Sequence, residues 1–278
     1  MLKPDFTTEF LAKIRDQAVP RIVRATLPFY AVQNDEIVRD RSGVFLRVGD
    51  EYFILTASHN LKAIVGHNIY LYVGWDEEDK VPVPIPDAKF HVTEEDIRDV
   101  AVIKLSREAA KKILSSHEPV GLRDIKFNVD RRPGLFLICG YPQAWLHVLP
   151  DHIESHPLPF LSGFYEGTPS ATADMKYDDN LHGLFQFTRA ALGDGSHPVS
   201  LPPFKGIQGI SGCGVWRICT FEEGVEGWSP EKCKLVAIQH RYYEKLSYVH
   251  TTWAKYALDR LTAEYPSVRK AMSLILPT

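Results

Sequence analysis

The sequence has little of what marks membrane, nucleic-acid-binding or disulfide-rich proteins. Its 278 residues carry 32 Lys and Arg against 35 Asp and Glu, a formal net charge of −3. A chain this close to neutral has no strong electrostatic attraction to nucleic acid or to anionic lipid. No apolar run approaches the length needed to span a bilayer. We therefore expect neither nucleic acid nor a membrane as a partner.

Cysteine is also scarce, and the four present, Cys139, Cys213, Cys219 and Cys233, form no CxxC pair or zinc-ribbon spacing. We predict free thiols, as in a reducing cytosol, while a Cys219–Cys233 bridge stays open as an alternative. The first residues contain no apolar segment followed by a small-residue cleavage site, so no secretory signal is expected. The expected location is cytoplasmic.

Helical periodicity is rare and is confined to the two ends of the chain and one stretch near its middle. Elsewhere, short β-like runs alternate with turns rich in Gly, Pro and polar residues. A parallel α/β sheet would need a helix between successive strands, and the sequence lacks such helices. The pattern predicts an all-β protein with two groups of strands. The expected units are an N-terminal helix in 1–20, a first group of strands in 21–114, a linker in 115–133, a second group of strands in 134–250 and a C-terminal helix in 251–278.

The most informative stretch is GIQGISGCGVW at 206–216, where Ser211 stands between glycines. Glycine admits backbone conformations that are closed to other residues. Such a run suits a tight turn that presents a hydroxyl and aims backbone N–H groups at one point. Acyl transfer needs that combination, a nucleophile beside an oxyanion hole. Taken alone, the run fits an ordinary glycine-rich turn better than a nucleophile loop, because short motifs often match by accident.

Two residues upstream supply what a serine nucleophile lacks. His59 is the third residue after the predicted strand Tyr52–Thr56, and Asp99 stands at the entrance of the buried-type strand Asp99–Leu105. Serine catalysis requires a base within hydrogen-bond reach of the hydroxyl. It also requires an acid that fixes the tautomer of the base and stabilises its charged form. The three residue types, each at a strand end or turn, therefore point to one shared cleft.

Several windows around these residues resemble motifs of the chymotrypsin- and trypsin-like serine proteases. LTASH at 55–59 looks like their histidine motif, DVAVIKL at 99–105 their aspartate motif, and GISG at 209–212 their nucleophile motif. GYP at 140–142 is similar to a turn of the bacterial members, and the strand at 234–239 to the one lining the substrate cleft. The resemblance, closest to bacterial-type intracellular trypsin-like peptidases, implies two six-stranded antiparallel β-barrels with N-terminal and C-terminal helices.

The same resemblance implies a serine endopeptidase that hydrolyses protein or peptide substrates through an acyl-enzyme, without a cofactor. It assigns the attack to Ser211 Oγ, proton transfer to His59 and orientation of His59 to Asp99. The backbone N–H groups of Gly209 and Ser211 form the implied oxyanion hole.

Two other nucleophile assignments fit less well. A Gly-x-Ser-x-Gly elbow of the α/β-hydrolases needs glycine at position 213, which is Cys213. In that family the acid and the histidine also follow the serine, whereas His59 and Asp99 precede it. Cys213 itself has Ser211, not an oxyanion-hole glycine, two residues before it.

The chain departs from the digestive proteases at two points. Ile210 stands where those enzymes have an aspartate that pairs with a newly cleaved N-terminus, so activation by such cleavage is not expected. Cys213-Gly214 replaces the usual Gly-Pro. These departures leave two alternatives open: a catalytically silent binding or sensor module regulated by a protein partner, and an esterase using the same three residues.

Cationic groups near the implied substrate pocket give the only indication of specificity. Lys205 precedes Ser211 by a few residues, and His240 and Arg241 follow the cleft-lining strand. Positive charge there would favour an acidic residue before the scissile bond. No metal site is expected, because three further histidines have spacing that fits no helical site and lie among prolines. These are His147, His152 and His156.

Overall fold

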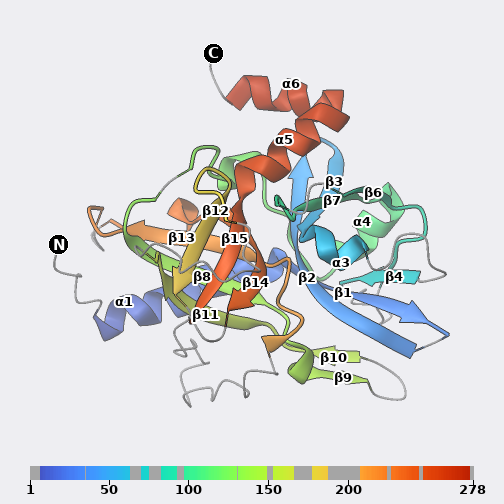
Figure 1. Ribbon diagram of the computed structural model, residues 1–278, viewed down its shortest axis with the longest axis horizontal. Helices are drawn as coiled ribbons and strands as arrows, with labels where there is room; N and C mark the ends of the chain where they lie inside the picture. The colour runs from blue at the N-terminus through green and yellow to red at the C-terminus, as the bar shows by residue number, and fades with distance from the viewer. Residues whose placement is uncertain are drawn as a thin grey trace.

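In the computed structural model the chain forms two curled antiparallel sheets that stand side by side (Figure 1). The strand order is β5-β4-β1-β2-β3-β7-β6 in the first sheet and β11-β8-β13-β14-β15-β12 in the second. This confirms the predicted all-β, double-barrel architecture. The structure describes residues 7–34, 36–62, 70–74, 83–92, 97–129, 131–148, 153–165, 177–186, 207–223, 227–243 and 247–275.

The first sheet has one strand more than the six predicted, because a two-residue strand, β5, pairs with β4 at its edge. A short helix, α3, follows β3, and a second helix, α4, follows β7. The bounds are β1 Thr26–Gln33, β2 Glu36–Val48, β3 Glu51–Thr56, α3 Ser58–Lys62, β4 Tyr70–Val73, β5 Val83–Pro84, β6 Lys89–Val92, β7 Ala101–Lys104 and α4 Arg107–Ile113.

The second sheet has the expected six strands, and a separate hairpin of β9 and β10 projects beside it (Figure 1). Short 3-10 turns precede β8, β9 and β14 along the chain. The bounds are η2 Leu122–Asp124, β8 Gly134–Gly140, η3 Gln143–Trp145, β9 Leu146–Val148, β10 Ile153–Ser155, β11 Leu158–Gly163, β12 His182–Gln186, β13 Gly214–Thr220, η5 Pro230–Lys232, β14 Lys234–Tyr243 and β15 Tyr248–Trp253.

The N-terminal helix is longer than the sequence indicates. It runs as α1 (Thr8–Lys13), a π-helical stretch η1 (Ile14–Ala18) and α2 (Val19–Arg24), whereas the sequence predicted an end near Pro20 and β-structure from Ile22. Pro20 lies in the first turn of α2, where its missing N–H is no loss. Ile22 turns inward and is 1% exposed, so its β-branched side chain serves packing in a helix.

This helix ties the segment between the sheets to the second sheet. The Phe10 ring packs edge-on against Trp228 with centroids 5.5 Å apart. Arg21 donates through Nη2 to Asp124 Oδ1 at 2.5 Å and through Nη1 to the Pro230 carbonyl at 2.8 Å. The contacts reach both the region after α4 and the loop before β14.

The C-terminal helices, α5 (Ala254–Glu264) and α6 (Pro266–Ile275), leave the last strand of the second sheet and return to the first. Tyr265, between them, packs on Phe53 of β3 with ring centroids 5.1 Å apart. Its hydroxyl lies 2.5 Å from His91 Nε2 on β6. Tyr265 therefore attaches the C-terminal helices, which continue from the second sheet, to the first sheet.

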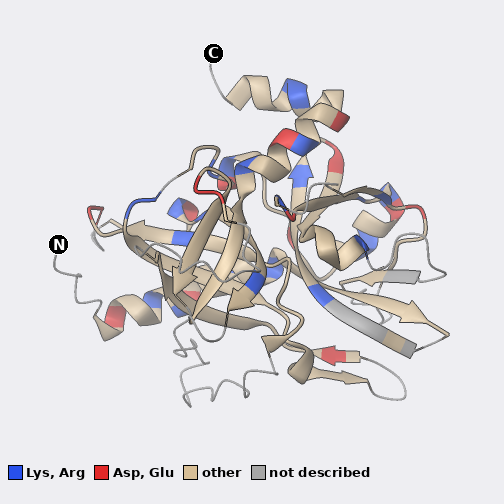
Figure 2. Cartoon of the chain, in the orientation of Figure 1, with Lys and Arg blue, Asp and Glu red and all other residues tan. Residues whose placement is uncertain are grey.

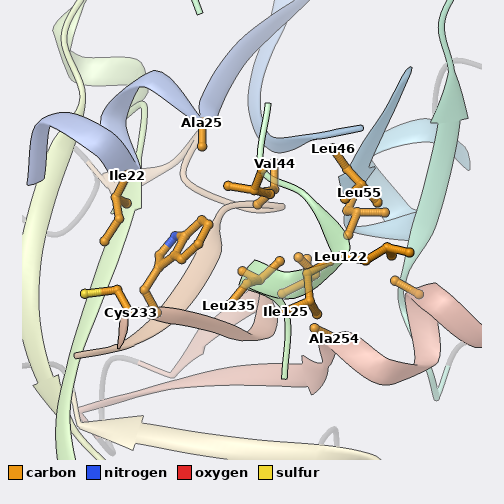
Figure 3. Close-up of a cluster of buried hydrophobic side chains, with 14 of the residues drawn as sticks. Ile22, Ala25, Val44, Leu46, Leu55, Leu122, Ile125, Cys233, Leu235 and Ala254 are labelled. Atoms are coloured by element: carbon orange, nitrogen blue, oxygen red, sulfur yellow. The ribbon is translucent and has the colours of Figure 1, made fainter. Parts of the chain in front are cut away.

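The largest buried apolar cluster belongs to both sheets at once (Figure 3). Val44 and Leu55 come from the first sheet and Leu235 from the second, and all three are 0% exposed. Ile22 and Ala254 add the N-terminal and C-terminal helices to the same cluster. Because burying a large aliphatic side chain contributes about 1.5–3 kcal/mol, this shared core holds the two sheets in a fixed relation.

One segment with the residues of a turn is a strand. The sequence Asp-Arg-Ser-Gly at 40–43 is typical of a turn, but β2 runs through it, with Ser42 opposite Pro28 and Gly43 opposite Leu27 in β1. A Cβ on Gly43 would overlap the Ile54 side chain of β3. Glycine is present there because two strands approach closely, not because the chain reverses.

Charge is mixed over the surface rather than gathered by sign. Figure 2 shows Lys and Arg beside Asp and Glu on α1 and on α5. Among the described residues, no helix is both long and apolar enough to cross a bilayer.

Candidate active site

Asp99 and His59 meet where β3 passes into α3. His59 Nδ1 lies 2.7 Å from Asp99 Oδ2, and the His59 backbone N–H donates to Asp99 Oδ1 at 2.8 Å. The Ser58 backbone N–H donates to the Asp99 carbonyl at 3.2 Å. The aspartate is therefore held by its side chain and its main chain together.

Asp99 adopts a left-handed backbone conformation, with φ at +39°. Such a conformation costs of order 1 kcal/mol or more for a residue with a side chain, although aspartate tolerates it better than most. The contacts to Ser58 and His59 hold it in place. Strain of this kind concentrates at functional sites, where surrounding structure over-determines the geometry.

Ser211 completes a hydrogen-bonded chain of three side chains. Its Oγ lies 2.9 Å from His59 Nε2 and 3.2 Å from the His240 carbonyl oxygen. With a neutral His59 carrying its proton on Nδ1, Nε2 is an acceptor for the serine hydroxyl. The Asp99 side chain is 13% exposed and the His59 side chain 43%. The acid is covered while the base reaches solvent.

A buried serine of the first sheet, Ser42, holds the loop that carries Ser211. Its backbone N–H donates to the Ser211 carbonyl at 3.1 Å, and its Oγ donates to the Gly209 carbonyl at 3.0 Å. The same Oγ accepts from the Tyr141 N–H at 2.8 Å. Sequence reasoning missed this role because Ser42 was assigned to a turn, and no local pattern marks a contact made so far along the chain.

Asn60 and Thr56 continue the same network. Asn60 Nδ2 donates to the Ser211 carbonyl at 2.9 Å and to Thr56 Oγ1 at 3.2 Å. Thr56 Oγ1 donates in turn to the Ser42 carbonyl at 2.8 Å. Gly212 packs against these groups and has φ at +95°. A Cβ on Gly212 would overlap the Ser42 carbonyl oxygen and Thr56 Oγ1. Only glycine fits.

The peptide that joins Gln208 to Gly209 has a fixed orientation. Its carbonyl accepts from the Gln143 N–H at 2.5 Å. Because the C=O and N–H of a trans peptide point in opposite directions, the Gly209 N–H points away from Gln143. Gly209 itself has φ at +100°, a conformation that favours glycine.

The peptide that joins Ile210 to Ser211 is held in the same way. The Ile210 carbonyl accepts from the Cys213 N–H at 3.0 Å, so the Ser211 N–H points away from that contact. Within the described part of the chain, neither the Gly209 nor the Ser211 N–H donates a hydrogen bond. Two undonated amides on either side of Ile210 are what a developing negative charge requires.

The two departures from the protease motif are packing positions. Ile210 is 2% exposed and Cys213 0%, and both belong to the second sheet's own apolar cluster. Burial raises the pKa of the Cys213 thiol well above its usual value, which makes it inert rather than nucleophilic. All four cysteines are free and buried, so the alternative Cys219–Cys233 bridge is absent.

The three predicted pocket residues are placed differently. His240 is 6% exposed, and its Nδ1 lies 3.4 Å from Asp99 Oδ2. Burial lowers its pKa, so at neutral pH it is an uncharged imidazole. Arg241, the next residue of β14, is exposed. Lys205 lies outside the described residues.

The histidines that the sequence set aside stay apart from the site. His147 is exposed on β9 and His156 lies between β10 and β11. His152 lies outside the described residues. The potential metal-binding cluster found in the described part of the chain contains neither His147 nor His156.

No family model and no curated protein sequence matches the chain. Solved structures do. A mutant of Rv3671c from M. tuberculosis in an inactive form superposes with a TM-score of 0.50 at 11% identity, over 95% of this chain and 96% of that one. Neuropsin, a mouse serine protease, gives a TM-score of 0.50 at 12% identity over 89% and 97%. The likeness shows the architecture: this chain has the chymotrypsin-like serine protease fold.

Proposed function

We propose that the protein is a trypsin-like serine endopeptidase in which His59, Asp99 and Ser211 are the catalytic residues. One observation carries the proposal: an unbroken hydrogen-bonded chain from Asp99 Oδ2 through His59 to Ser211 Oγ, at 2.7 and 2.9 Å. The undonated amides of Gly209 and Ser211 support it as the oxyanion hole. The exposed base and covered acid agree with a site open to a peptide.

The proposed reaction begins when Ser211 Oγ attacks the scissile carbonyl carbon and His59 Nε2 takes the hydroxyl proton. The carbonyl oxygen becomes an oxyanion that accepts hydrogen bonds from the Gly209 and Ser211 N–H groups; each such donor contributes about 10²–10³ in rate. Asp99 keeps the His59 proton on Nδ1 and stabilises the imidazolium. His59 then gives its proton to the departing amine, which leaves an acyl-enzyme.

Hydrolysis of the acyl-enzyme repeats the same steps with water. His59 Nε2 takes a proton from water as the oxygen attacks the ester carbonyl. The resulting tetrahedral intermediate collapses, His59 protonates Ser211 Oγ, and the carboxylic acid product leaves. Every proton transfer uses one imidazole nitrogen, so the geometry at His59 decides both halves of the reaction.

Substrate preference is part of the proposal at a lower level of detail. Of the three predicted pocket residues, Arg241 is the exposed cation that the structure describes, because His240 is buried and neutral and Lys205 lies outside the described residues. A preference for an acidic residue before the scissile bond therefore rests on Arg241. A cytoplasmic location is likewise proposed, and the four free thiols support it.

A fluorophosphonate probe tests the proposal directly. The parent protein is expected to label at one residue, Ser211, and to cleave an unstructured protein such as casein. Ser211→Ala should abolish labelling, and His59→Ala should lower its rate by three orders of magnitude or more. The control is His147→Ala, an exposed histidine outside the site. Comparing peptide with ester turnover separates a peptidase from an esterase.

Two results would overturn the proposal. One is an absence of labelling in the folded parent. The other is a labelling rate that is the same in the parent and in His59→Ala.

A further inference from the structure

Three buried histidines cluster behind Asp99, on strands that lie side by side in the second sheet (Figure 1). His182 is on β12, His240 on β14 and His250 on β15, and they are 0%, 6% and 3% exposed. The ring centroids of His250 and each of the other two are 4.4 Å apart. One ring nitrogen of each residue lies within 4.8 Å of those of the other two.

Two of these rings contain a buried nitrogen without a partner. Nε2 of His240 and Nε2 of His250 accept and donate no hydrogen bond among the described residues. Nearly all buried polar groups in proteins are satisfied, so two orphans in one cluster call for an explanation. A bound ligand that accepts electron pairs would satisfy both at once.

The chemical state of the rings suits a metal ion. Burial lowers the pKa of His182 and of His240, and it lowers the pKa of His250 to about 3. The imidazoles are therefore neutral at physiological pH, which is the form that binds metal. Imidazole is a preferred ligand of Zn²⁺ and of neighbouring transition metals.

The surroundings of His240 match those of a metal-bound histidine. Its Nδ1 lies 3.4 Å from Asp99 Oδ2, while its Nε2 faces no partner. A proton on Nδ1, directed at the carboxylate, leaves the Nε2 lone pair available. Histidines that bind metals usually donate their other N–H to a carboxylate or a carbonyl in this way.

His182 already makes two hydrogen bonds, and one of them occupies the nitrogen that would bind the metal. Its Nε2 lies 2.6 Å from the Ile97 carbonyl, and its Nδ1 accepts from the Asp178 N–H at 2.9 Å. With Nε2–H donating to Ile97, Nδ1 has the lone pair. Binding a metal through Nδ1 requires only that the Asp178 N–H turn away.

We propose that His182, His240 and His250 form a site for one divalent transition-metal ion of the Zn²⁺ class. His240 and His250 bind through Nε2 and His182 through Nδ1, and a fourth position stays open for water. Ligands at about 2.0–2.1 Å from zinc bring their nitrogens closer than 4.8 Å, so the rings move inward on binding. The ion enters past the half-buried rings of Tyr177 and Tyr243, which lie 5.8 and 6.0 Å from His250.

A metal ion bound to the three histidines would affect the proposed peptidase site through Asp99. This effect is the one part of the proposal that rests on the proposed function. Metal on Nε2 withdraws electron density from the His240 ring, so the Nδ1–H that faces Asp99 Oδ2 becomes a stronger donor. The same oxygen accepts from His59 Nδ1. A stronger competing donor on that oxygen weakens the hold of Asp99 on His59. Zinc is therefore expected to slow peptide hydrolysis several-fold without touching Ser211.

Calorimetry with Zn²⁺ alone tests the site independently of activity. The experiment uses the chelator-treated full chain carrying Ser211→Ala, because this substitution prevents self-digestion. The chain is expected to bind one Zn²⁺. His250→Ala and, in a separate protein, His240→Gln should weaken binding at least tenfold. His147→Ala removes a surface histidine, and His117→Gln a buried one outside the cluster; both should bind as the Ser211→Ala parent does. Co²⁺ in place of Zn²⁺ should give the strong visible bands of a four-coordinate site.

The outcomes distinguish the site from the activity. A folded Ser211→Ala chain that binds no Zn²⁺ in a one-to-one ratio would overturn the site, as would equal affinity in His240→Gln. A weak, six-coordinate Co²⁺ spectrum would overturn it too, and this needs no cluster variant to fold. One-to-one Zn²⁺ binding by the Ser211→Ala chain, together with no fluorophosphonate labelling of the folded protein that retains Ser211, would leave the metal site standing and remove the peptidase.

Discussion

At the scale of single residues, the site depends on groups that carry no chemistry themselves. Ser42 contacts the Ser211 carbonyl, the Gly209 carbonyl and the Tyr141 N–H, and each contact fixes part of the nucleophile loop. Gly212 leaves room for that network. These two residues position the proposed catalytic groups, so their replacement should affect geometry more than substrate binding.

Ser42→Ala is expected to remove two hydrogen bonds made by Oγ while keeping the backbone contact to Ser211. The loss leaves the Gly209 carbonyl and the Tyr141 N–H unpaired in a buried site, at about 1–3 kcal/mol each. The fluorophosphonate labelling rate should fall about tenfold or more, and the free energy of unfolding should fall as well. Ser115→Ala, an exposed serine after α4, is the control and should change neither.

Gly212→Ala should prevent the loop from reaching its place. The left-handed backbone and the overlap with Ser42 and Thr56 act together, and we expect a loss of more than about 3 kcal/mol in urea unfolding. Gly49→Ala is a matched control, since Gly49 has φ at +60° but nothing within 4 Å of the added Cβ. It should cost about 1 kcal/mol. Equal losses in both variants would contradict the close approach at Gly212.

At the scale of elements, the segments outside the sheets fasten the two sheets to each other. Tyr265, between α5 and α6, contacts Phe53 and His91 in the first sheet. The region after α4 lies against the first sheet as well, since His117 is 5% exposed and packs beside Gly74. Both attachments have measurable signatures.

Tyr265→Ala should free α5 and α6 from the first sheet. Truncating a large packed aromatic ring costs about 3 kcal/mol or more, and limited proteolysis should begin to cut within 254–275. Tyr265→Phe keeps the ring on Phe53 and loses only the hydroxyl contact to His91, so it should cost about 1 kcal/mol. Protection of the helices in Tyr265→Ala equal to that in Tyr265→Phe would refute this attachment.

His117 makes stability depend on pH. Burial lowers its pKa to about 4, whereas the unfolded value is about 6.5. Between these values the unfolded chain binds more protons, so stability is full above pH 6.5 and falls as the pH drops to 4. At 1.36 kcal/mol per unit, His117 accounts for a loss of about 3 kcal/mol. Urea unfolding of His117→Gln should show a shallower decline than the parent over this range.

At the scale of the whole molecule, the two sheets behave as one unit. Their largest apolar cluster takes side chains from both sheets and from the N-terminal and C-terminal helices (Figure 3). The proposed catalytic groups are divided in the same way. His59 is in α3 and Asp99 precedes β7, both beside the first sheet, and Ser211 precedes β13 of the second. Neither sheet contains the whole site.

Unfolding should therefore be a single cooperative transition, despite two sheets. Far-UV circular dichroism and tryptophan fluorescence are expected to report the same urea midpoint. Leu235→Ala, in the shared core, should lower both midpoints equally through a loss of about 2–5 kcal/mol. Separate midpoints for the two probes would mean that each sheet holds its own stability.

The strand and turn pattern predicts an all-β protein with two groups of strands, because short β-like runs and sparse helical periodicity are local signals. The two barrels are what the resemblance of the motifs to serine proteases implies. The sequence also predicts that His59, Asp99 and Ser211 lie close together, because each of them stands within a short recognisable motif. It does not reveal Ser42, His182 or His250. Their roles arise from strand register and from contacts between distant segments, which leave no local pattern. Pro20 leads to the wrong helix end for a related reason. Proline is as compatible with the first turn of a helix as with the end of one, and the local sequence does not distinguish the two.

The contact between Ser42 and the nucleophile loop has a consequence for how the protein is made. Ser42 and Gly209 are 167 residues apart, so β2 leaves the ribosome long before the loop that it will hold. Synthesis proceeds from the N-terminus, and the first sheet is complete while Ser211 is not yet translated. Until the nucleophile loop has been synthesised, the Ser42 hydroxyl lacks its acceptor, the Gly209 carbonyl. The proposed hydrolytic activity thus arises only after the segment that carries Ser211 and the strands of the second sheet that follow it have been synthesised.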